Sequence, residues 1–84
     1  MHGVYILRSK KDGDLYIGYS HDIKRRLKDH NDGKVPATDR RRPLQMIYCE
    51  LFINRKDAMR RELYLKSGWG RKYLAKVLHE TLSI

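Results

Sequence analysis

Apolar and polar residues alternate in blocks over the first twenty positions. Two short runs rich in Val, Ile and Tyr, residues 3–7 and 16–20, are separated by the polar segment 9–14. β-branched and aromatic residues favour strands, and Asp12-Gly13 suits a type I′ turn because glycine tolerates a positive φ. The pattern predicts an antiparallel β-hairpin with Asp12 and Gly13 at the centre of its turn.

This turn sets a register in which Leu7 lies opposite Gly18 and Tyr5 opposite Ser20. Because side chains alternate between the faces of a strand, one face is apolar and belongs against a core; it holds Val4, Ile6, Leu15, Ile17 and Tyr19. We expect the other face to be exposed, with Tyr5 and Tyr16 flanking Gly18, where a ligand can approach the backbone. The alternative is that both tyrosines are ordinary strand residues.

Helical spacing follows the hairpin. Residues 23–31 are predicted to form a helix that is capped by Ser20 or Asp22 and ends at Gly33. An arginine beside a buried stripe must find a partner or border a cleft, which makes Arg26 notable. The inner side of this helix carries Ile23, Arg26, Leu27 and His30.

The middle of the chain changes from polar to apolar. Segment 31–43 predicts a loop whose arginines are free to reach phosphates, or else a merely solubilising loop. The dense apolar run 44–53 predicts a third strand, in the middle of the sheet or covered on both faces. Its single cysteine, Cys49, is expected to be buried.

Two further helices complete the pattern, one after the cap Asn54 and one over 71–82, separated by a turn at 67–70. Trp69 in this turn is expected to anchor the core; the alternative is that it stacks on a base. Glu62 lies within the inner stripe of the first of them. A carboxylate directed inward must be ion-paired, protonated or bound to metal. A structural ion pair with an arginine such as Arg26 is the alternative to a metal. The predicted inner residues are Ala58, Met59, Leu63, Leu65, Leu74, Val77, Leu78 and Leu82.

Charge and composition limit the classes of partner and the cellular compartment that this protein could have. The 84 residues contain 19 Lys and Arg against 10 acidic residues, a formal net charge of +9. Such an excess favours a nucleic-acid partner, although acidic proteins and membrane surfaces also attract basic domains. No apolar segment approaches a membrane span, and one cysteine cannot form an intrachain disulfide, so we expect a soluble, cytoplasmic protein. The chain shows no zinc-ligand spacing and no phosphate-binding glycine loop.

Several positions together resemble the GIY-YIG endonuclease family. Gly3-Val4-Tyr5 and Tyr16-Ile17-Gly18 resemble its signature, with Val for the first Ile. The segment 22–30 resembles the family pattern Asp-Leu-x-x-Arg-Leu-x-x-His, which puts the catalytic arginine on Arg26, and Ala58-x-x-x-Glu62 resembles the setting of the metal-binding glutamate. The match runs from Gly3 to Lys66 and looks most like the small stand-alone bacterial members. It implies one nuclease domain over residues 1–84, of α/β (α+β) class, with a small three-stranded antiparallel sheet, flanking helices and the order β-β-α-β-α-α.

The resemblance implies a metal-dependent endonuclease that hydrolyses phosphodiester bonds in DNA, structure-selective or weakly specific, in DNA repair or processing. Glu62 would hold one Mg²⁺ or Mn²⁺, Tyr5 would orient or deprotonate the attacking water, and Tyr16 would help to position it. Arg26 would neutralise developing charge, and His30 would contact phosphate or accept a proton. The candidate nucleic-acid contacts are Gly18, Arg25, Lys34, Arg40, Arg41 and Arg42.

Other readings stay open. A non-catalytic nucleic-acid-binding module would share the fold and charge, and a protein-interaction domain could bind an acidic partner. An inward carboxylate favours the nuclease, because a module that only binds does not require one. The choice between DNA and RNA is open, and a protein partner or a homodimer could supply specificity.

Overall fold

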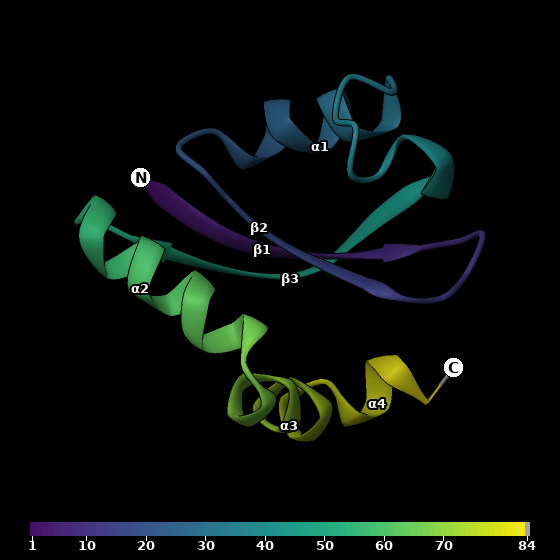
Figure 1. The fold of residues 1–84 in the computed structure, drawn as a ribbon. Helices are drawn as coiled ribbons and strands as arrows, with labels where there is room; N and C mark the ends of the chain where they lie inside the picture. The colour runs from purple at the N-terminus through teal and green to yellow at the C-terminus, as the bar shows by residue number, and fades with distance from the viewer. Residues whose placement is uncertain (84) are drawn as a thin grey trace.

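The structure is a computed structural model that describes residues 1–83. Three antiparallel strands form one sheet in the order β2-β1-β3, with α1 on one face and the later helices on the other (Figure 1). This arrangement confirms the predicted α+β class and the β-β-α-β-α-α order. The elements are β1 (His2–Ser9), β2 (Leu15–Ser20), α1 (Ile23–Asn31), a 3₁₀ turn (Asp39–Arg41), β3 (Leu44–Phe52), α2 (Arg55–Lys66), α3 (Gly68–Val77) and the short α4 (His79–Leu82).

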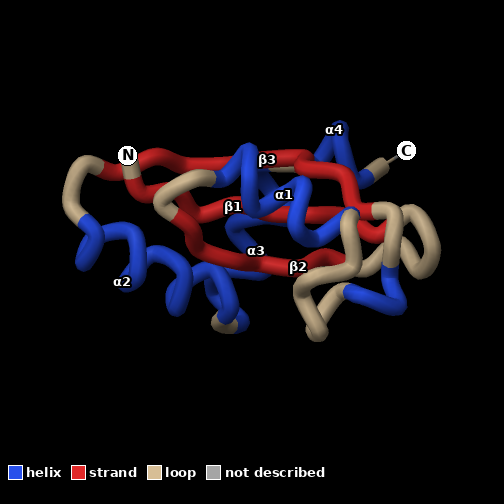
Figure 2. The backbone as a smooth tube through the Cα atoms, turned by 90° about the horizontal axis from the view of Figure 1, so that it is seen from above, coloured by secondary structure: helices blue, strands red, loops and turns tan. Residues whose placement is uncertain are grey.

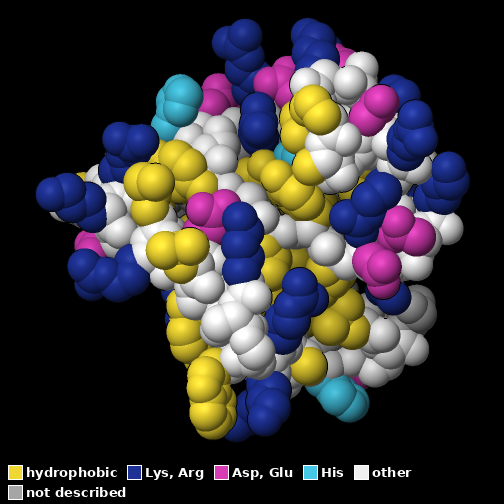
Figure 3. Space-filling model, viewed as in Figure 1, with side chains coloured by type: hydrophobic (Ala, Val, Ile, Leu, Met, Phe, Trp, Pro, Cys, Tyr) yellow, Lys and Arg dark blue, Asp and Glu magenta, His cyan; other side chains and the backbone are white. Residues whose placement is uncertain are grey.

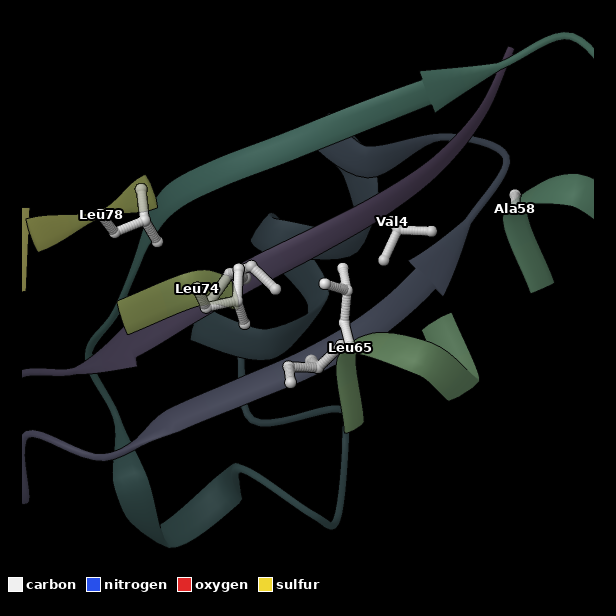
Figure 4. Close-up of a cluster of buried hydrophobic side chains, with 7 residues drawn as sticks. Val4, Ala58, Leu65, Leu74 and Leu78 are labelled. Carbon is white, nitrogen blue, oxygen red and sulfur yellow. The ribbon is translucent and has the colours of Figure 1, made fainter. Parts of the chain in front are cut away.

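The larger core lies between the sheet and helices α2 and α3. Alternation along β1 and β2 turns one apolar face toward these helices, as the sequence predicts. Figure 4 shows side chains from β1 and the helices meeting in this layer. The buried members are Val4, Ile6, Ile17, Ala58, Leu65, Leu74 and Leu78.

The opposite face of the sheet is also buried, which the sequence analysis did not expect. Tyr5, predicted on an exposed face, is only 1% exposed and packs with Leu7 and Leu44. Helix α1 lies over this face (Figures 1 and 2) and adds Ile23 and Leu27 to the cluster. The central strand β1 is therefore covered on both sides, and the expectation of an open tyrosine face is wrong.

The hairpin register differs from the prediction by two residues. Tyr5 lies opposite Gly18, and Leu7 lies opposite Tyr16. The connection is longer than a two-residue turn because the Ser9 hydroxyl accepts hydrogen bonds from the N–H groups of Lys11 and Asp12, at 3.1 Å each. A shift of two residues preserves the alternation, so the assignment of side chains to faces still holds.

Helix α1 has the predicted bounds, and Asp22 caps it by accepting a hydrogen bond from the Arg25 N–H at 3.1 Å. Helix α2 also starts where expected, after Asn54. Its inner stripe differs, because Met59 and Leu63 are exposed. Leu63 lies roughly 140° around the helix from buried Ala58, too far to share one stripe.

The third strand lies at the edge of the sheet, not in its middle. β1 pairs with both β2 and β3, so the central place belongs to the first strand. Both α1 and α2 contact β3, which explains its dense apolar pattern. The predicted burial of Cys49 is wrong, since an edge strand has no neighbour on its outer side and this residue is exposed.

Helix α3 begins at Gly68, three residues before the predicted start. Ser67 caps it by accepting a hydrogen bond from the Gly70 N–H at 3.2 Å. A Cβ on Gly70 would lie 2.7 Å from the Leu65 carbonyl carbon, so only glycine allows this close approach. Trp69 then points outward and is 74% exposed, which contradicts its predicted place in the core.

The predicted helix over residues 71–82 is interrupted at Leu78, where α3 ends and α4 follows. Leu74 and Leu78 are buried as expected, whereas Val77 is exposed. Among the described residues no helix combines the length and the apolar character needed to cross a membrane.

Candidate active site

Two tyrosines and a histidine meet beneath α1. Tyr5 on β1 and Tyr16 on β2 share one face of the hairpin, and their ring centroids are 6.4 Å apart. The His30 ring, on the inner side of α1, meets both edge-on, at 5.6 Å from Tyr5 and 5.1 Å from Tyr16. The strand alternation and the helical spacing thus bring together three of the predicted site residues.

A chain of hydrogen bonds runs through His30. Its Nε2 lies 2.8 Å from the Tyr5 hydroxyl, and its Nδ1 lies 2.6 Å from the hydroxyl of Thr38. All three side chains are buried. Thr38 belongs to the loop before β3, and sequence reasoning missed it because nothing in a polar loop marks which hydroxyl folds back onto α1.

The protonation states of Tyr5 and His30 follow from their burial and from one nearby cation. Burial raises the pKa of Tyr5 to about 12, the Arg26 guanidinium opposes the rise, and the charges of Tyr16 and Glu62 add to it. Burial also lowers the pKa of His30, and Arg26 lowers it further. Both groups are therefore neutral near pH 7. Because the Arg26 cation acts on the Tyr5 oxygen, we expect the Tyr5 hydroxyl to donate its proton to His30 Nε2.

Gly18 has a different role from the predicted one. The Tyr5 ring lies across from it in the adjacent strand, and a Cβ at Gly18 would come within 2.9 Å of Tyr5 Cε2. The space over this glycine is thus filled by the tyrosine itself, so the expectation that a ligand approaches the backbone here is wrong. Gly18 is required because it makes room for Tyr5.

Arg26 and Glu62 approach this cluster from opposite layers of the molecule. Arg26, half-buried on α1, borders a cavity of about 190 Å³ together with Arg25 and Asp29. Glu62, on α2, is near enough to raise the pKa of Tyr5, and its side chain is 19% exposed. Its partner is Lys66, at 3.1 Å, and the described residues contain no ion pair between Glu62 and Arg26. Glu62 thus has an ion-pair partner, as the structural alternative requires, but that partner is a lysine one turn along α2 and not an arginine.

The donor set fits a hard cation that is held largely by water and substrate. Within residues 1–83 no group of three or more His, Cys, Asp or Glu side chains could hold a metal ion. Mg²⁺ needs no such cage, since it keeps several waters and binds through one or two carboxylates plus substrate phosphates. Glu62, whose side chain is partly exposed on α2, meets that requirement.

The predicted nucleic-acid contacts fall into two groups. Arg25, Lys34 and Arg40 are exposed. Arg41 and Arg42 are not free, because Arg41 Nε lies 2.9 Å from an Asp12 carboxylate oxygen and Arg42 lies 3.1 Å from Asp39. The first of these ion pairs ties the loop to the hairpin turn, so part of the basic loop is structural.

Arg61 is a supporting residue that was not among the predicted site residues. It is half-buried and forms two hydrogen bonds to Glu50, at 2.7 and 3.0 Å, while its guanidinium lies 4.7 Å from the centre of the Tyr73 ring. The sequence did contain a sign of this ion pair, because Glu50 is the one charged residue within an apolar strand and needs a partner. This pair fixes α2 against β3 one residue before Glu62.

Comparison with known proteins agrees with this arrangement. The model of the GIY-YIG catalytic domain matches residues 1–73, and the chain belongs to the GIY-YIG family, which is a family of nucleases. It is similar to the UPF0213 protein SSP2268 of Staphylococcus saprophyticus, with 39% identity over 94% of this chain and 95% of that one. A UPF0213 protein of Bacillus licheniformis is 46% identical over 77% of this chain and 67% of its own length.

A solved structure shares the fold. The solution NMR structure of the UPF0213 protein BH0048 from Bacillus halodurans is 37% identical to this chain. It covers 90% of this chain and 83% of its own, with a TM-score of 0.56.

Proposed function

We propose that this chain is an endonuclease that hydrolyses phosphodiester bonds in DNA with the help of one divalent ion, Mg²⁺ or Mn²⁺. The observation that carries the proposal is the buried Tyr5–His30 pair, 2.8 Å apart, with Arg26 beside it and Glu62 close to it. A base, a cation for phosphate and a carboxylate for a metal are the parts that such a hydrolysis needs. The net charge of +9 supports a polyanionic substrate.

Tyr5 is the group that orients and deprotonates the attacking water. With a pKa of about 12 it is a neutral phenol near pH 7, so it acts as a base only if its own proton has somewhere to go. The neutral His30 imidazole provides that place, because its Nε2 lies 2.8 Å from the phenol oxygen. The proton passes to His30 as the water loses its own proton to Tyr5.

Arg26 and Tyr16 act on the phosphate side. A planar guanidinium that is always charged can donate two hydrogen bonds to phosphoryl oxygens as negative charge grows on them. Tyr16, whose ring is 6.4 Å from that of Tyr5, positions the water or a phosphate oxygen. Glu62 would hold the divalent ion, which supplies Lewis-acid stabilisation of the phosphate and of the leaving oxygen.

The cellular role that we propose is DNA repair or processing, with selection by DNA structure. Lys and Arg side chains are spread over the visible face of the molecule (Figure 3), and such scattered cations favour contact with the phosphate backbone over base reading. A protein partner or a second copy would then supply any sequence choice.

The test is an assay of the purified chain on duplex, flap and branched DNA and on RNA, with Mg²⁺, Mn²⁺ or EDTA. We expect metal-dependent cleavage of DNA and a loss of at least about 100-fold in Tyr5→Phe, the scale for removing a general base. His79→Gln, which changes an exposed histidine on α4 that does not line the cavity beside Arg26, is the matched control and should cleave as the parent does. Binding without cleavage under every condition would favour the non-catalytic module instead.

A further inference from the structure

Helix α2 and the start of α3 expose an unusual number of large apolar side chains. Leu63 is 69% exposed and Trp69 74%, and Met59 is also exposed. Neighbouring lysines, Lys66 and Lys72, are exposed as well. We call these five residues the α2–α3 surface. Figure 3 shows hydrophobic side chains lying among dark blue basic ones on the visible face of the molecule.

The part of this surface on α2 adjoins Glu62 of the candidate active site, and Trp69 and Lys72 follow along the chain at the start of α3. Successive residues of an α-helix are turned by about 100°, so Lys66, Met59 and Leu63 follow Glu62 around α2 in that order. Lys66 contacts Glu62 directly, with Nζ and carboxylate oxygen 3.1 Å apart. A polymer that passes Glu62 would therefore continue onto these side chains.

The chemistry of the surface selects the kind of occupant. Lys72 Nζ lies 5.2 Å from the centre of the Trp69 ring, which holds the indole between a cation and the solvent. Interfaces between proteins are depleted in lysine at their centres, and a second copy of a chain with a net charge of +9 would bring like charges together. An aromatic plane flanked by cations fits a polyanion that carries flat rings, which is how proteins hold single-stranded nucleic acid.

We propose that the α2–α3 surface binds an unpaired strand of the nucleic-acid substrate, with one base stacked on Trp69 and its flanking phosphates near Lys66 and Lys72. This proposal rests on the proposed function, since it places the strand beside the same site. It also gives a physical reason for structure selectivity. Flaps and branches offer unpaired bases next to a scissile bond, whereas an intact duplex does not.

Trp69 is the only tryptophan in the chain, so its fluorescence reports on this surface alone. We expect an oligothymidylate of about ten nucleotides to quench the emission, because a stacked base replaces water on the indole. Heparin, a polyanion without bases, should bind through charge but quench the Trp69 emission much less than oligothymidylate does. A duplex of the same length should also quench weakly.

Three variants separate stacking from charge and from folding. In a fluorescence-anisotropy assay with a labelled oligonucleotide, Trp69→Ala should bind about 5- to 150-fold more weakly, the range for loss of one stacked base. Trp69→Phe should retain most of the affinity. Val77→Ala, which trims another exposed apolar residue of α3, should bind as the parent does.

The outcomes are distinct. Unchanged affinity in Trp69→Ala, or equal quenching by heparin and oligothymidylate, overturns the stacking surface while leaving the proposed nuclease intact. Quenching that grows with protein concentration alone, without nucleic acid, identifies a second copy as the occupant and also overturns it. A chain that binds no nucleic acid at all refutes the proposed function together with this inference.

Discussion

Replacing Glu62 by glutamine separates a metal-binding role from a structural one. The side chain is 19% exposed, and its ion pair with Lys66 joins positions i and i+4 on the surface of α2. Pairs of this kind contribute only about 0.3–0.5 kcal/mol to folding. Since about 1 kcal/mol shifts the melting temperature of a domain this small by about 4–8 °C, Glu62→Gln should melt no more than about 2–4 °C below the parent.

The effect on cleavage should be much larger. Glutamine keeps the size of the side chain but cannot offer a charged oxygen to a divalent ion, so we expect cleavage to fall by at least about 100-fold. Binding should be as tight as in the parent, or tighter, because one negative charge near the phosphate is lost. Single-turnover cleavage of a flap substrate, anisotropy binding and thermal unfolding by circular dichroism measure the three quantities.

Asp57→Asn is the matched control, because it removes one exposed carboxylate from the first turn of the same helix. It should lose at most about 1 kcal/mol through the helix dipole and cleave normally. A fall of ten degrees or more in the melting temperature of Glu62→Gln, or cleavage equal to that of the parent, would refute the assignment of Glu62 as the metal ligand.

Three further predictions concern the tyrosine–histidine chain. Gly18→Ala should destabilise the fold by about 1–3 kcal/mol, seen in urea unfolding, because the new methyl group meets the Tyr5 ring. Thr38→Val should lower the free energy of unfolding by about 1–3 kcal/mol, because it leaves a buried ring N–H of His30 without an acceptor. Thr38→Ser keeps the hydroxyl and should not lower it. In the parent, the ¹⁵N shifts of the imidazole should show the proton on Nδ1. The pKa of His30 is lower in the folded protein than in the unfolded chain. Below about pH 6.5 the unfolded chain therefore binds a proton more readily than the folded protein does, and the free energy of unfolding should fall as the pH falls. Above about pH 10, unfolded Tyr5 releases a proton that the folded group, with a pKa of about 12, retains, so the free energy of unfolding should fall as the pH rises. Free energies of unfolding that do not change across either pH range would contradict these protonation states of Tyr5 and His30.

Features that depend on local spacing could be predicted from the sequence. Alternation assigned the faces of the hairpin, and that assignment survived a register error because the error was an even number of residues. Helical spacing placed Arg26 and His30 on the inner side of α1, where the structure has them half-buried and buried. The unusual inward position of Glu62 was also visible, because a charge stands out against an apolar stripe.

Features that depend on how elements pack could not be predicted in this way. The burial of Tyr5 requires α1 to lie over its face, and the contact of Thr38 with His30 requires the following loop to fold back. Trp69 illustrates a different failure. Its exposure follows from the Ser67 cap and from the close packing of Gly70 on Leu65, which together start α3 early and leave no place for the indole in the core.

The burial that the sequence analysis missed is also what makes His30 necessary. On an exposed face, Tyr5 would keep a pKa near 10 and could pass its proton to water. Under α1 the phenolate is disfavoured, because burial raises that pKa to about 12. A buried tyrosine can serve as a base only if a neutral acceptor waits within hydrogen-bond distance and a cation stands close by. His30 and Arg26, four residues apart on the same inner side of α1, meet both conditions, so the helix that closes off the tyrosine also carries the groups that allow it to work.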